Sequence, residues 1–508
     1  MASRTSREDT YFLGIDVGTT SVKAVLYNPR TGQVEQKAAH PTPTEHPRPD
    51  WAHWDPEALW NAVVHAVREV VAPRNIRHRV AGIGIASVGE AGLPLDAAGT
   101  PLYPIIAWFD PRGEEQVQRW RAEHDLRALY RVTGHTPRAI YTLFKILWLR
   151  DHHPEVVQRM RSWLFVGDYI AYRLTGEVAT VPTLAARSYM FDVVQRGWSP
   201  AILEEAGLRS DQLPPVQPTT LPVGQVTEGA ARALGVAAGI PVALGGHDHV
   251  VGMWVAGITL PGRAVDSSGT AQAVAVHLPQ FVGDAGYEVR MTCYPFVVGD
   301  GYILQGGMPT AGAALQWLAD LLAQGDVDLL LRWAETAPPG SHGVGCVPFL
   351  RGAGSPYGRS DVRALFYHLD LSTGRADMAR ALVEGLACFL ADIVQHIERI
   401  TASPVQEIRA IGGSNRSDFL LRVKSTMLGL PVVRVDVPEA VGVGAALLAG
   451  VAAGYFASAE EALASVYIPE VRVLPHQEWR AAYRHVFWKY QVWVHATLTA
   501  SGESGPPG

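Results

Sequence analysis

Two similar segments lie about half a chain apart in this 508-residue sequence, and they constrain the fold more than any other feature. Each has an apolar lead, an aspartate (Asp16 or Asp266), a turn of small residues containing Gly-Thr, and a second apolar run. Two apolar runs around a glycine-containing turn predict a β-hairpin. The repeat predicts two similar halves that each open with a hairpin, with chance similarity as the alternative.

The rest of the chain alternates between strand and helix patterns, which predicts an α/β fold. The expected strands and hairpins cover 11–26, 80–86, 240–246, 264–276 and 407–411. A helix is expected to follow Asp55 as its N-cap, and further helices are expected over 113–130, 141–175, 311–335 and 376–401.

Composition excludes several classes of protein. Lys and Arg number 43 against 49 Asp and Glu, a net charge of −6, so nucleic acid is not an expected partner. Cys293, Cys346 and Cys388 are far apart, which excludes a disulfide framework and a cysteine zinc site. No run of about 18 apolar residues predicts a membrane span. The polar N-terminus lacks a signal core, so a cytoplasmic location is expected.

The turn of the first hairpin has the composition of a phosphate site. Glycine lets backbone N–H groups approach an anion closely, and hydroxyl groups add donors. Asp16 can hold Mg²⁺, because hard cations prefer oxygen ligands, while Lys23 lies nearby. The plainer alternative is an ordinary hairpin turn. The turn residues are Gly18, Thr19, Thr20 and Ser21, and the second copy contributes Gly269 and Thr270.

Reactive side chains also follow the strand expected at 240–246. Asp248 at a strand end can act as a general base toward an attacking alcohol. A metal site on His247 and His249 is one alternative, and a helix cap by Asp248 is another. The motifs of P-loop, Rossmann, serine hydrolase and zinc protease sites are absent from the sequence.

A third cluster combines an aromatic ring with charged groups. Trp108, Asp110 and Arg112 suit a sugar, which proteins hold by an aromatic face and charge-assisted hydrogen bonds. Glu90, in a glycine-flanked turn, is a candidate for the same site. The alternative places Trp108 in the core and pairs Asp110 with Arg112 as a surface ion pair.

These residues resemble the FGGY family of carbohydrate kinases over nearly the whole chain. Asp16–Lys23 resembles the first phosphate hairpin of the family, and Ser268–Thr270 resembles the second phosphate loop. Gly246–Asp248 is similar to the G-x-D that holds the catalytic base. The other matching segments are Trp108–Arg112, Lys145–Trp148, Gly306–Trp317, Tyr357–Leu371, Ala381–Ala387 and Gly412–Asn415.

The resemblance implies two actin-like (ribonuclease H-like) domains, each with a mixed sheet flanked by helices, and ATP and sugar in the cleft between them. The implied domains are 1–256 and 257–480, followed by a terminal helix and disordered tail over 481–508. It implies transfer of the γ-phosphoryl group of MgATP to a sugar hydroxyl, with Asp248 as base and Asp16 positioning Mg²⁺. The implied cofactor-binding residues are Asp16, Gly18, Thr19, Thr20, Ser21, Lys23, Gly269, Thr270, Gly312, Gly412, Gly413 and Asn415. The implied substrate-binding residues are Glu90, Trp108, Asp110, Arg112 and His247.

The sequence departs from the best-known subfamilies after the third expected strand. Residues 87–92 match neither the Q-M-H-G typical of xylulokinases nor the Arg-Glu pair of glycerol kinases. The expected substrate is a ketopentose such as xylulose, with a polyol or a deoxy-ketose as alternatives and a homodimer left open. A different class, an actin-like ATPase switch without a sugar substrate, shares the phosphate hairpins.

Overall fold

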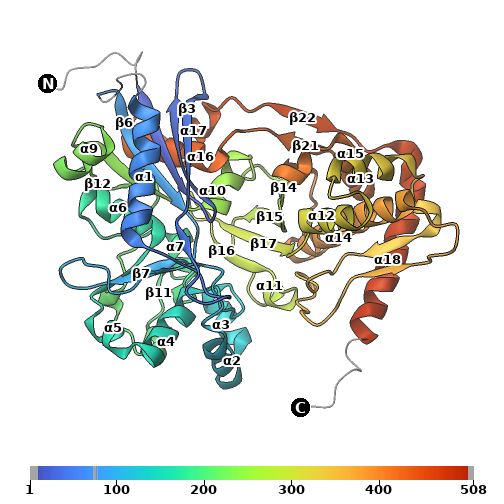
Figure 1. Ribbon diagram of the computed structural model, residues 1–508, viewed down its shortest axis with the longest axis horizontal. Helices are drawn as coiled ribbons and strands as arrows, with labels where there is room; N and C mark the ends of the chain where they lie inside the picture. Colours follow the sequence, from blue (N-terminus) through green and yellow to red (C-terminus); the bar gives the residue numbers. More distant parts are fainter. Residues whose placement is uncertain (1–9, 73–75, 77, 501–508) are drawn as a thin grey trace. The chain divides into compact units, whose positions relative to one another are not determined.

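The computed structural model describes residues 10–72, 76 and 78–500 (Figure 1). It divides into two compact units. The first unit contains Met1–Val255, Tyr294–Tyr302 and Val437–Tyr467, and the second contains Ala256–Cys293, Ile303–Asp436 and Ile468–Gly508. This division differs from the boundaries predicted at 256/257 and 480/481, because residues 437–467 return to the first unit.

The first unit is built on a six-stranded mixed sheet with the order β12-β13-β6-β1-β2-β3. β1 and β2 form the antiparallel hairpin that the sequence predicts, while β6 and β13 run parallel to β1. The strands are β1 (Tyr11–Val17), β2 (Ser21–Asn28), β3 (Gln33–Pro41), β6 (Val80–Ser87), β12 (Pro222–Gln225) and β13 (Pro241–His247).

Helices cover this sheet, and one of them begins as predicted. Asp55 caps α1 (Pro56–Val71), accepting a hydrogen bond from the Ala58 N–H at 2.7 Å. α1 packs on β2 and β3, and α6 (Val166–Thr175) packs on β6 and β13. The other helices near the sheet are α9 (Glu228–Leu234), α10 (Asp248–Val255), α16 (Ala440–Ala452) and α17 (Ala459–Ala464).

α16 joins the first unit because glycines let it lie directly on the strands. A Cβ atom on Gly14 of β1 would lie 1.8 Å from the carbonyl oxygen of Gly442. A Cβ atom on Gly84 of β6 would lie 1.9 Å from that of Ala445. Neither strand therefore tolerates a side chain there, and this close packing accounts for the return of residues 437–467 to the first unit.

A smaller layer extends the first unit, with the sheet order β4-β5-β8-β7-β9. The helix predicted over 141–175 is interrupted in the structure. Pro154 begins a new helix, and the four-residue strand β9 pairs antiparallel with β7. The elements are β4 (Thr44–Glu45), β5 (His53–Trp54), β7 (Gly92–Leu95), β8 (Ile105–Ile106), α2 (Glu114–Glu123), α3 (Leu126–Thr133), α4 (Thr142–His152), α5 (Pro154–Arg159), β9 (Ser162–Phe165), α7 (Pro182–Ala186), β10 (Phe191–Asp192), β11 (Gly197–Trp198) and α8 (Pro200–Ala206).

The second unit repeats the order of the first sheet. Its strands lie in the order β16-β17-β15-β14-β20-β21-β22. β14 and β15 form the antiparallel hairpin, β20 and β21 run parallel to β14, and β22 is antiparallel, as β12 is in the first unit. The strands are β14 (Arg263–Ser268), β15 (Gln272–Leu278), β16 (Thr292–Pro295), β17 (Tyr302–Met308), β20 (Glu407–Ile411), β21 (Val432–Val435) and β22 (Glu470–Val473). The shared topology confirms the prediction of two similar halves.

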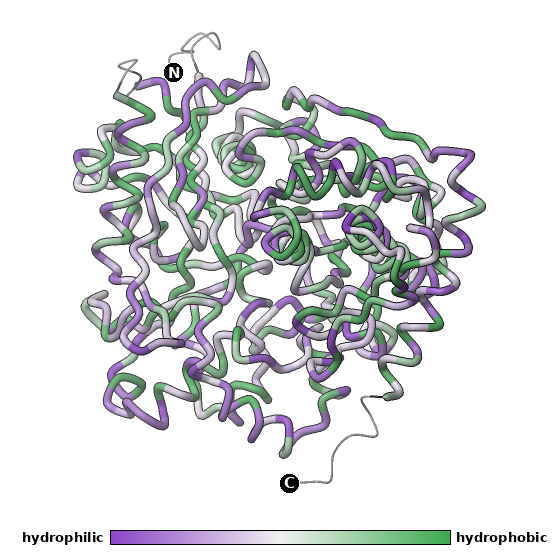
Figure 2. The backbone as a smooth tube through the Cα atoms, turned by 45° about the vertical axis from the view of Figure 1, so that its right-hand side comes forward, coloured by the Kyte–Doolittle hydropathy of each residue, from purple (hydrophilic) through white to green (hydrophobic). Residues whose placement is uncertain are grey.

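The helices of the second unit pack around α14, which is buried along most of its length. Figure 2 shows polar and apolar stretches alternating along the helices, as expected for helices with one buried face. The remaining elements are α11 (Asp284–Glu288), α12 (Gly312–Leu322), α13 (Val327–Thr336), β18 (Gly345–Val347), β19 (Leu365–Tyr367), α14 (Arg375–Thr401), α15 (Asp418–Leu428) and α18 (Arg480–Ala500). Residues 501–508 of the predicted tail lie outside the described residues. Among those described, no helix has the length and apolarity needed to cross a membrane.

Candidate active site

Three parallel strands of the first unit end at the same edge of the sheet. Asp16 at the end of β1 is in register with Ala86 of β6, and Ser87 of β6 is in register with His247 of β13. The segments after parallel strands meet at this edge, where α/β proteins bind ligands. The sheet therefore brings together Asp16, the turn that contains Glu90, and Asp248.

Asp248 stands where β13 passes into α10, and a tight backbone turn places it there. Gly246 has a φ of +96°, and a Cβ atom on it would lie 2.1 Å from the Thr183 hydroxyl oxygen. That hydroxyl accepts a hydrogen bond from the His247 N–H at 3.1 Å. Only glycine fits this turn, and α10 begins at Asp248 itself.

Asp248 and Asp16 are both mostly buried carboxyl groups with raised pKa values. Their side chains are 17% and 10% exposed. Burial raises the pKa of Asp248 to about 7, and the negative charge of Glu90 adds to this effect. Burial also raises the pKa of Asp16 to about 7, with Asp248 as the next cause. The two carboxylates repel each other, and a nearby cation would relieve this repulsion.

The charges around Asp16 fit a magnesium ion. Lys23 Nζ lies 3.7 Å from Asp16 Oδ2 and 3.1 Å from Glu439 Oε2, so it neutralises this edge only in part. Across residues 10–72, 76 and 78–500, no cluster of three or more His, Cys, Asp and Glu residues could hold a metal. A cation at Asp16 would therefore complete its shell with water and phosphate oxygens, as Mg²⁺ commonly does. The same finding gives no support to the metal alternative at His247 and His249.

Glu90 is held by an arginine that the sequence did not single out. The Arg187 guanidinium donates to Glu90 Oε1 and lies 5.2 Å and 5.5 Å from the ring centroids of Tyr141 and Tyr294. Burial and the charge of Arg187 hold the pKa of His247 well below its usual value, so this ring is neutral. Glu90 thus belongs to a buried network of charged and aromatic groups in the first unit.

Trp108 is connected directly to the turn of the first hairpin. Its Nε1–H donates to the Thr19 hydroxyl at 2.8 Å. Behind it, Lys145 Nζ donates to the carbonyl oxygens of Trp108 and Ala139, both at 3.3 Å. Burial lowers the pKa of Lys145 to about 7. The predicted sugar side and the predicted phosphate turn are therefore linked through Trp108 and Thr19.

Asp110 and Arg112 differ from the prediction, because the structure encloses both side chains completely. Arg112 donates through Nε and Nη2 to the two carboxylate oxygens of Asp110 at 2.8 Å and 2.7 Å. The guanidinium carbon lies 4.4 Å and 5.0 Å from the ring centroids of Trp51 and Trp148, which contact each other edge to face. A second hydrogen bond to Asp110 Oδ2 comes from the Ala52 N–H. Neither side chain can touch a ligand here, and the surface-pair alternative is wrong because the pair is buried.

The turn between β1 and β2 keeps several groups available to an anion. The Gly18 N–H is bound to the Ser21 carbonyl at 3.1 Å, and the Gly18 carbonyl accepts from Thr42 Oγ1 at 2.8 Å. These bonds fix the turn. Thr20 is exposed at its tip, and Thr19 and Ser21 are half-buried.

The second unit holds a cavity of about 620 Å³ that gathers four of the predicted cofactor-binding residues. They are Gly269, Thr270, Gly312 and Gly413. The walls also include residues of α12 and of the loop after β20 that were not named as binding residues, although all but Asp320 lie in segments that match the family: Ala313, Gln316, Trp317, Asp320 and Ser414. Gln316 lies four residues after Gly312, and residues at this spacing share one face of a helix. This spacing was the signal that could have identified Gln316.

Asn415 and Gly412 lie behind the walls of this cavity. The Asn415 amide donates to the carbonyl oxygens of Asp266 and Ile411, and its oxygen accepts from Lys424 Nζ at 2.7 Å. Gly412 has a φ of +92°, and a Cβ atom there would lie 2.5 Å from the Ser268 carbonyl. Both residues thus hold the turn after β20 against the second hairpin.

Three charged residues important to the site escaped the sequence analysis because distant segments supply them. Arg187 follows α7, Glu439 precedes α16, and Lys424 belongs to α15. Their partners are respectively Glu90, Lys23 and Asp266. No local pattern in the sequence marks such long-range ion pairs.

Comparison with known proteins extends over most of the chain. A xylulose kinase of Staphylococcus xylosus is 27% identical over 486 residues, covering 95% of this chain and 99% of the relative. A glycerol kinase of Gloeobacter violaceus is 29% identical over 495 residues, covering 95% and 97%. The crystal structure of a xylulose kinase from Rhodospirillum rubrum is similar with a TM-score of 0.89 at 27% identity, covering 97% of this chain and 100% of that one.

The family comparison covers each predicted half. The N-terminal domain of the FGGY family of carbohydrate kinases matches residues 11–254, and its C-terminal domain matches residues 265–453. Together with the shared architecture, these matches confirm the two-domain actin-like fold. The chain belongs to the FGGY family of carbohydrate kinases.

Proposed function

We propose that this ATP-dependent carbohydrate kinase phosphorylates a hydroxyl group of a small ketose, with a ketopentose such as xylulose as the first candidate. The observation that carries the proposal is the placement of Asp248, a mostly buried carboxyl group at the end of β13 with a pKa of about 7. The similarity to a xylulose kinase supports the ketopentose, and the similarity to a glycerol kinase supports the polyol alternative. A deoxy-ketose is the remaining alternative. A cytoplasmic location and a homodimer stay predictions.

In this proposal Asp248 is the general base. Its carboxylate accepts the proton of the sugar hydroxyl as that oxygen attacks the γ-phosphorus of ATP, and ADP leaves. A base with a pKa near 7 is matched to neutral pH, since about half of it is ionised there and the ionised form accepts a proton readily. The bond from the His249 N–H to Asp248 Oδ1 at 2.7 Å fixes the orientation of the carboxylate.

Glu90, Trp108 and His247 are proposed to bind the sugar. Glu90 accepts hydrogen bonds from sugar hydroxyls while Arg187 holds its carboxylate in place. Trp108 offers an apolar ring that the Thr19 contact orients. Asp110 and Arg112 act indirectly, because their enclosed ion pair shapes the segment that carries Trp108.

Asp16 is proposed to hold Mg²⁺, which when bound neutralises charge on the phosphates of ATP. The turn residues Gly18, Thr19, Thr20 and Ser21, with Lys23, bind phosphate oxygens. The cavity of the second unit binds the nucleotide, with Gly269, Thr270, Gly312 and Gly413 in its wall. Gly412 and Asn415 support that wall from behind.

The test is ADP release in a coupled assay against ketopentoses, ketohexoses, deoxy-ketoses, tetritols, pentitols and glycerol. Under the proposal, a ketopentose raises ADP release far above the sugar-free rate. A larger response to a polyol or a deoxy-ketose would identify that compound as the substrate instead of a ketopentose. The assignment of Asp248 as the base would still hold. Sugar-free ATP hydrolysis with no response to any compound would contradict the proposed substrate class.

A further inference from the structure

A second cavity, of about 400 Å³, lies in the second unit on the outer helix α18. Its wall is formed by the loop after α13, Tyr367 of β19 and one face of α18. The ionisable side chains in the wall other than Tyr367 are His342, His485 and Lys489, and the wall contains no aspartate or glutamate. None of the nucleotide- and sugar-binding candidates borders this cavity, so it is a separate feature of the molecule.

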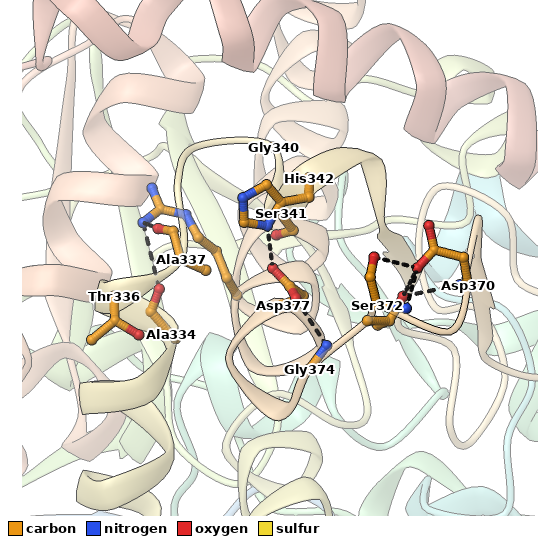
Figure 3. Close-up of polar contacts among 12 residues, drawn as sticks. Ala334, Thr336, Ala337, Gly340, Ser341, His342, Asp370, Ser372, Gly374 and Asp377 are labelled. Carbon is orange, nitrogen blue, oxygen red and sulfur yellow. Dashed lines mark hydrogen bonds and ion pairs between the residues drawn. The ribbon is translucent and has the colours of Figure 1, made fainter.

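The basic groups of this cavity have unused binding capacity. Among residues 10–72, 76 and 78–500, none forms an ion pair or hydrogen bond with the side chains of His485 or Lys489. His342 Nδ1 lies 2.8 Å from Asp377 Oδ1, which leaves Nε2 as the ring nitrogen available to a ligand. Figure 3 shows the His342 ring facing Asp377, whose other oxygen accepts from the Gly374 N–H. Asp377 thus fixes the orientation of the imidazole.

The loop that carries His342 is strained. Four consecutive residues have φ angles in the left-handed region: Gly340 at +86°, Ser341 at +49°, His342 at +52° and Gly343 at +99°. Two of them are not glycine, and such a conformation costs free energy unless the surroundings impose it. Strained backbone of this kind is concentrated at ligand-binding positions in proteins.

A buried hydrogen-bond network imposes that conformation and connects it to α18. Glu384 Oε1 accepts from the Gly340 N–H at 3.0 Å and from Arg380 Nε at 2.9 Å. Arg380 donates in turn to the Tyr483 hydroxyl of α18 at 2.8 Å and to the Ala337 carbonyl at 2.7 Å. The loop and the helix that supply the basic groups are therefore fixed to the same buried residues, and the cavity is preformed.

We propose that this cavity is a binding site for a small organic anion, specifically a phosphate monoester whose apolar or ring portion packs on the wall. The phosphate is bound by His342, His485 and Lys489, whose N–H donors line the cavity from two elements. The apolar part contacts Pro338, Val486 and Tyr367. Binding at this site is independent of phosphoryl transfer and of the substrate proposed above.

The test is calorimetric titration of the full-length protein with inorganic phosphate and with phenyl phosphate, with ADP present to fill the nucleotide site. Phenyl phosphate is expected to bind more tightly than phosphate because its ring reaches the apolar wall. Lys489→Gln and His342→Asn are each expected to weaken binding roughly 10-fold or more, the size expected for loss of a charged hydrogen bond. Asparagine is chosen at 342 because it tolerates the left-handed conformation.

Arg484→Gln is the matched control, since Arg484 is an exposed residue of the same helix outside the cavity. It removes the same charge and is expected to leave both affinities unchanged. Thermal unfolding of each variant checks that the fold is retained. Equal affinities in Lys489→Gln, His342→Asn and the unsubstituted protein, or no binding of either probe, would overturn the proposal. Because binding is measured without a sugar, this result is independent of the substrate panel.

Discussion

The two hairpins of this kinase have the same topology but use their aspartates differently. Asp16, at the end of β1, is 10% exposed, lies 3.7 Å from Lys23, and has a pKa raised to about 7. Asp266, in β14, is fully enclosed and lies 2.6 Å from Lys424 Nζ. Its other oxygen accepts from Ser268 and Gln272, both at 2.8 Å.

The difference shows that the charged and hydrogen-bonding groups around a carboxylate decide its role more than the local sequence pattern does. Asp266 has its charge neutralised and its lone pairs filled, so it stabilises the second hairpin and has no capacity for a ligand. Asp16 faces Asp248 and is only partly neutralised, so it is suited to binding a cation. The two aspartates therefore differ in role: Asp16 keeps the capacity to bind a cation, whereas Asp266 braces the second hairpin.

The largest effect should come from replacing Asp248, the proposed general base. Asp248→Asn keeps the size of the side chain but removes the base, so we expect kcat to fall about 10²–10⁴-fold. ATP binding should change little, and the unfolding midpoint should not fall. Asp50→Asn, an exposed substitution in the same unit, serves as the control. Near-normal phosphorylation by Asp248→Asn would show that Asp248 is not the general base.

The second prediction compares how much each hairpin aspartate contributes to the free energy of unfolding. Asp266→Asn leaves Lys424 buried without a charged partner, so we expect the free energy of unfolding to fall by about 3–5 kcal/mol. Asp16→Asn should lower kcat without this loss. Denaturant unfolding of both variants measures the contrast. A double variant, Asp266→Leu with Lys424→Met, should recover much of the stability, and failure to do so would show that the ion pair is not the cause.

The third effect is the pH dependence of stability in protein freed of metal and nucleotide by a chelator. The folded-state pKa values of Asp16 and Asp248 are raised from 3.8 to about 7. The folded state therefore binds more protons than the unfolded state between these values, and stability falls as pH rises from about 4 to about 7. Thermal midpoints across this range should fall less steeply in Asp16→Asn. A slope identical to that of the unsubstituted protein would contradict the assigned burial.

The smallest effect compares hydroxyl groups at the two turns. Ser268→Ala removes the hydrogen bond to Asp266 and the contact with Lys424 at 3.2 Å, so we expect a loss of about 1 kcal/mol. Thr20→Ala changes an exposed hydroxyl and should stay within about 0.5 kcal/mol. Its effect should instead be a higher KM for ATP. Equal stability losses in the two variants would contradict the conclusion that the second hairpin depends on its buried polar contacts and the first does not.

The elements with strong local patterns could be predicted from the sequence. Both hairpins, α1 with its Asp55 cap, and the strand before Asp248 have patterns that do not depend on distant partners. The order of the motifs also identified the family. The strand β9 was missed because its four residues stand between α5 and α6 with only two residues before it and none after it.

The candidate site was predicted less completely, and the physical reason is long-range pairing. Asp16, Glu90 and Asp248 could be singled out because each follows an apolar strand or lies in a glycine-rich turn. Their environments depend on Arg187 and Glu439, which the fold supplies from other segments. Asp110 and Arg112 were assigned to the ligand because sequence alone does not show that Trp51 and Trp148 enclose them.

The return of α16 to the first sheet has a consequence for how the chain folds as it is synthesised. β1, β6 and β13 are translated before residue 248, whereas the helix that packs on Gly14 and Gly84 is not complete until Ala452. At about 5–20 residues per second, this interval lasts roughly 10–40 s. Throughout it, the nascent first unit presents an uncovered apolar sheet face, which is a surface that chaperones protect during translation.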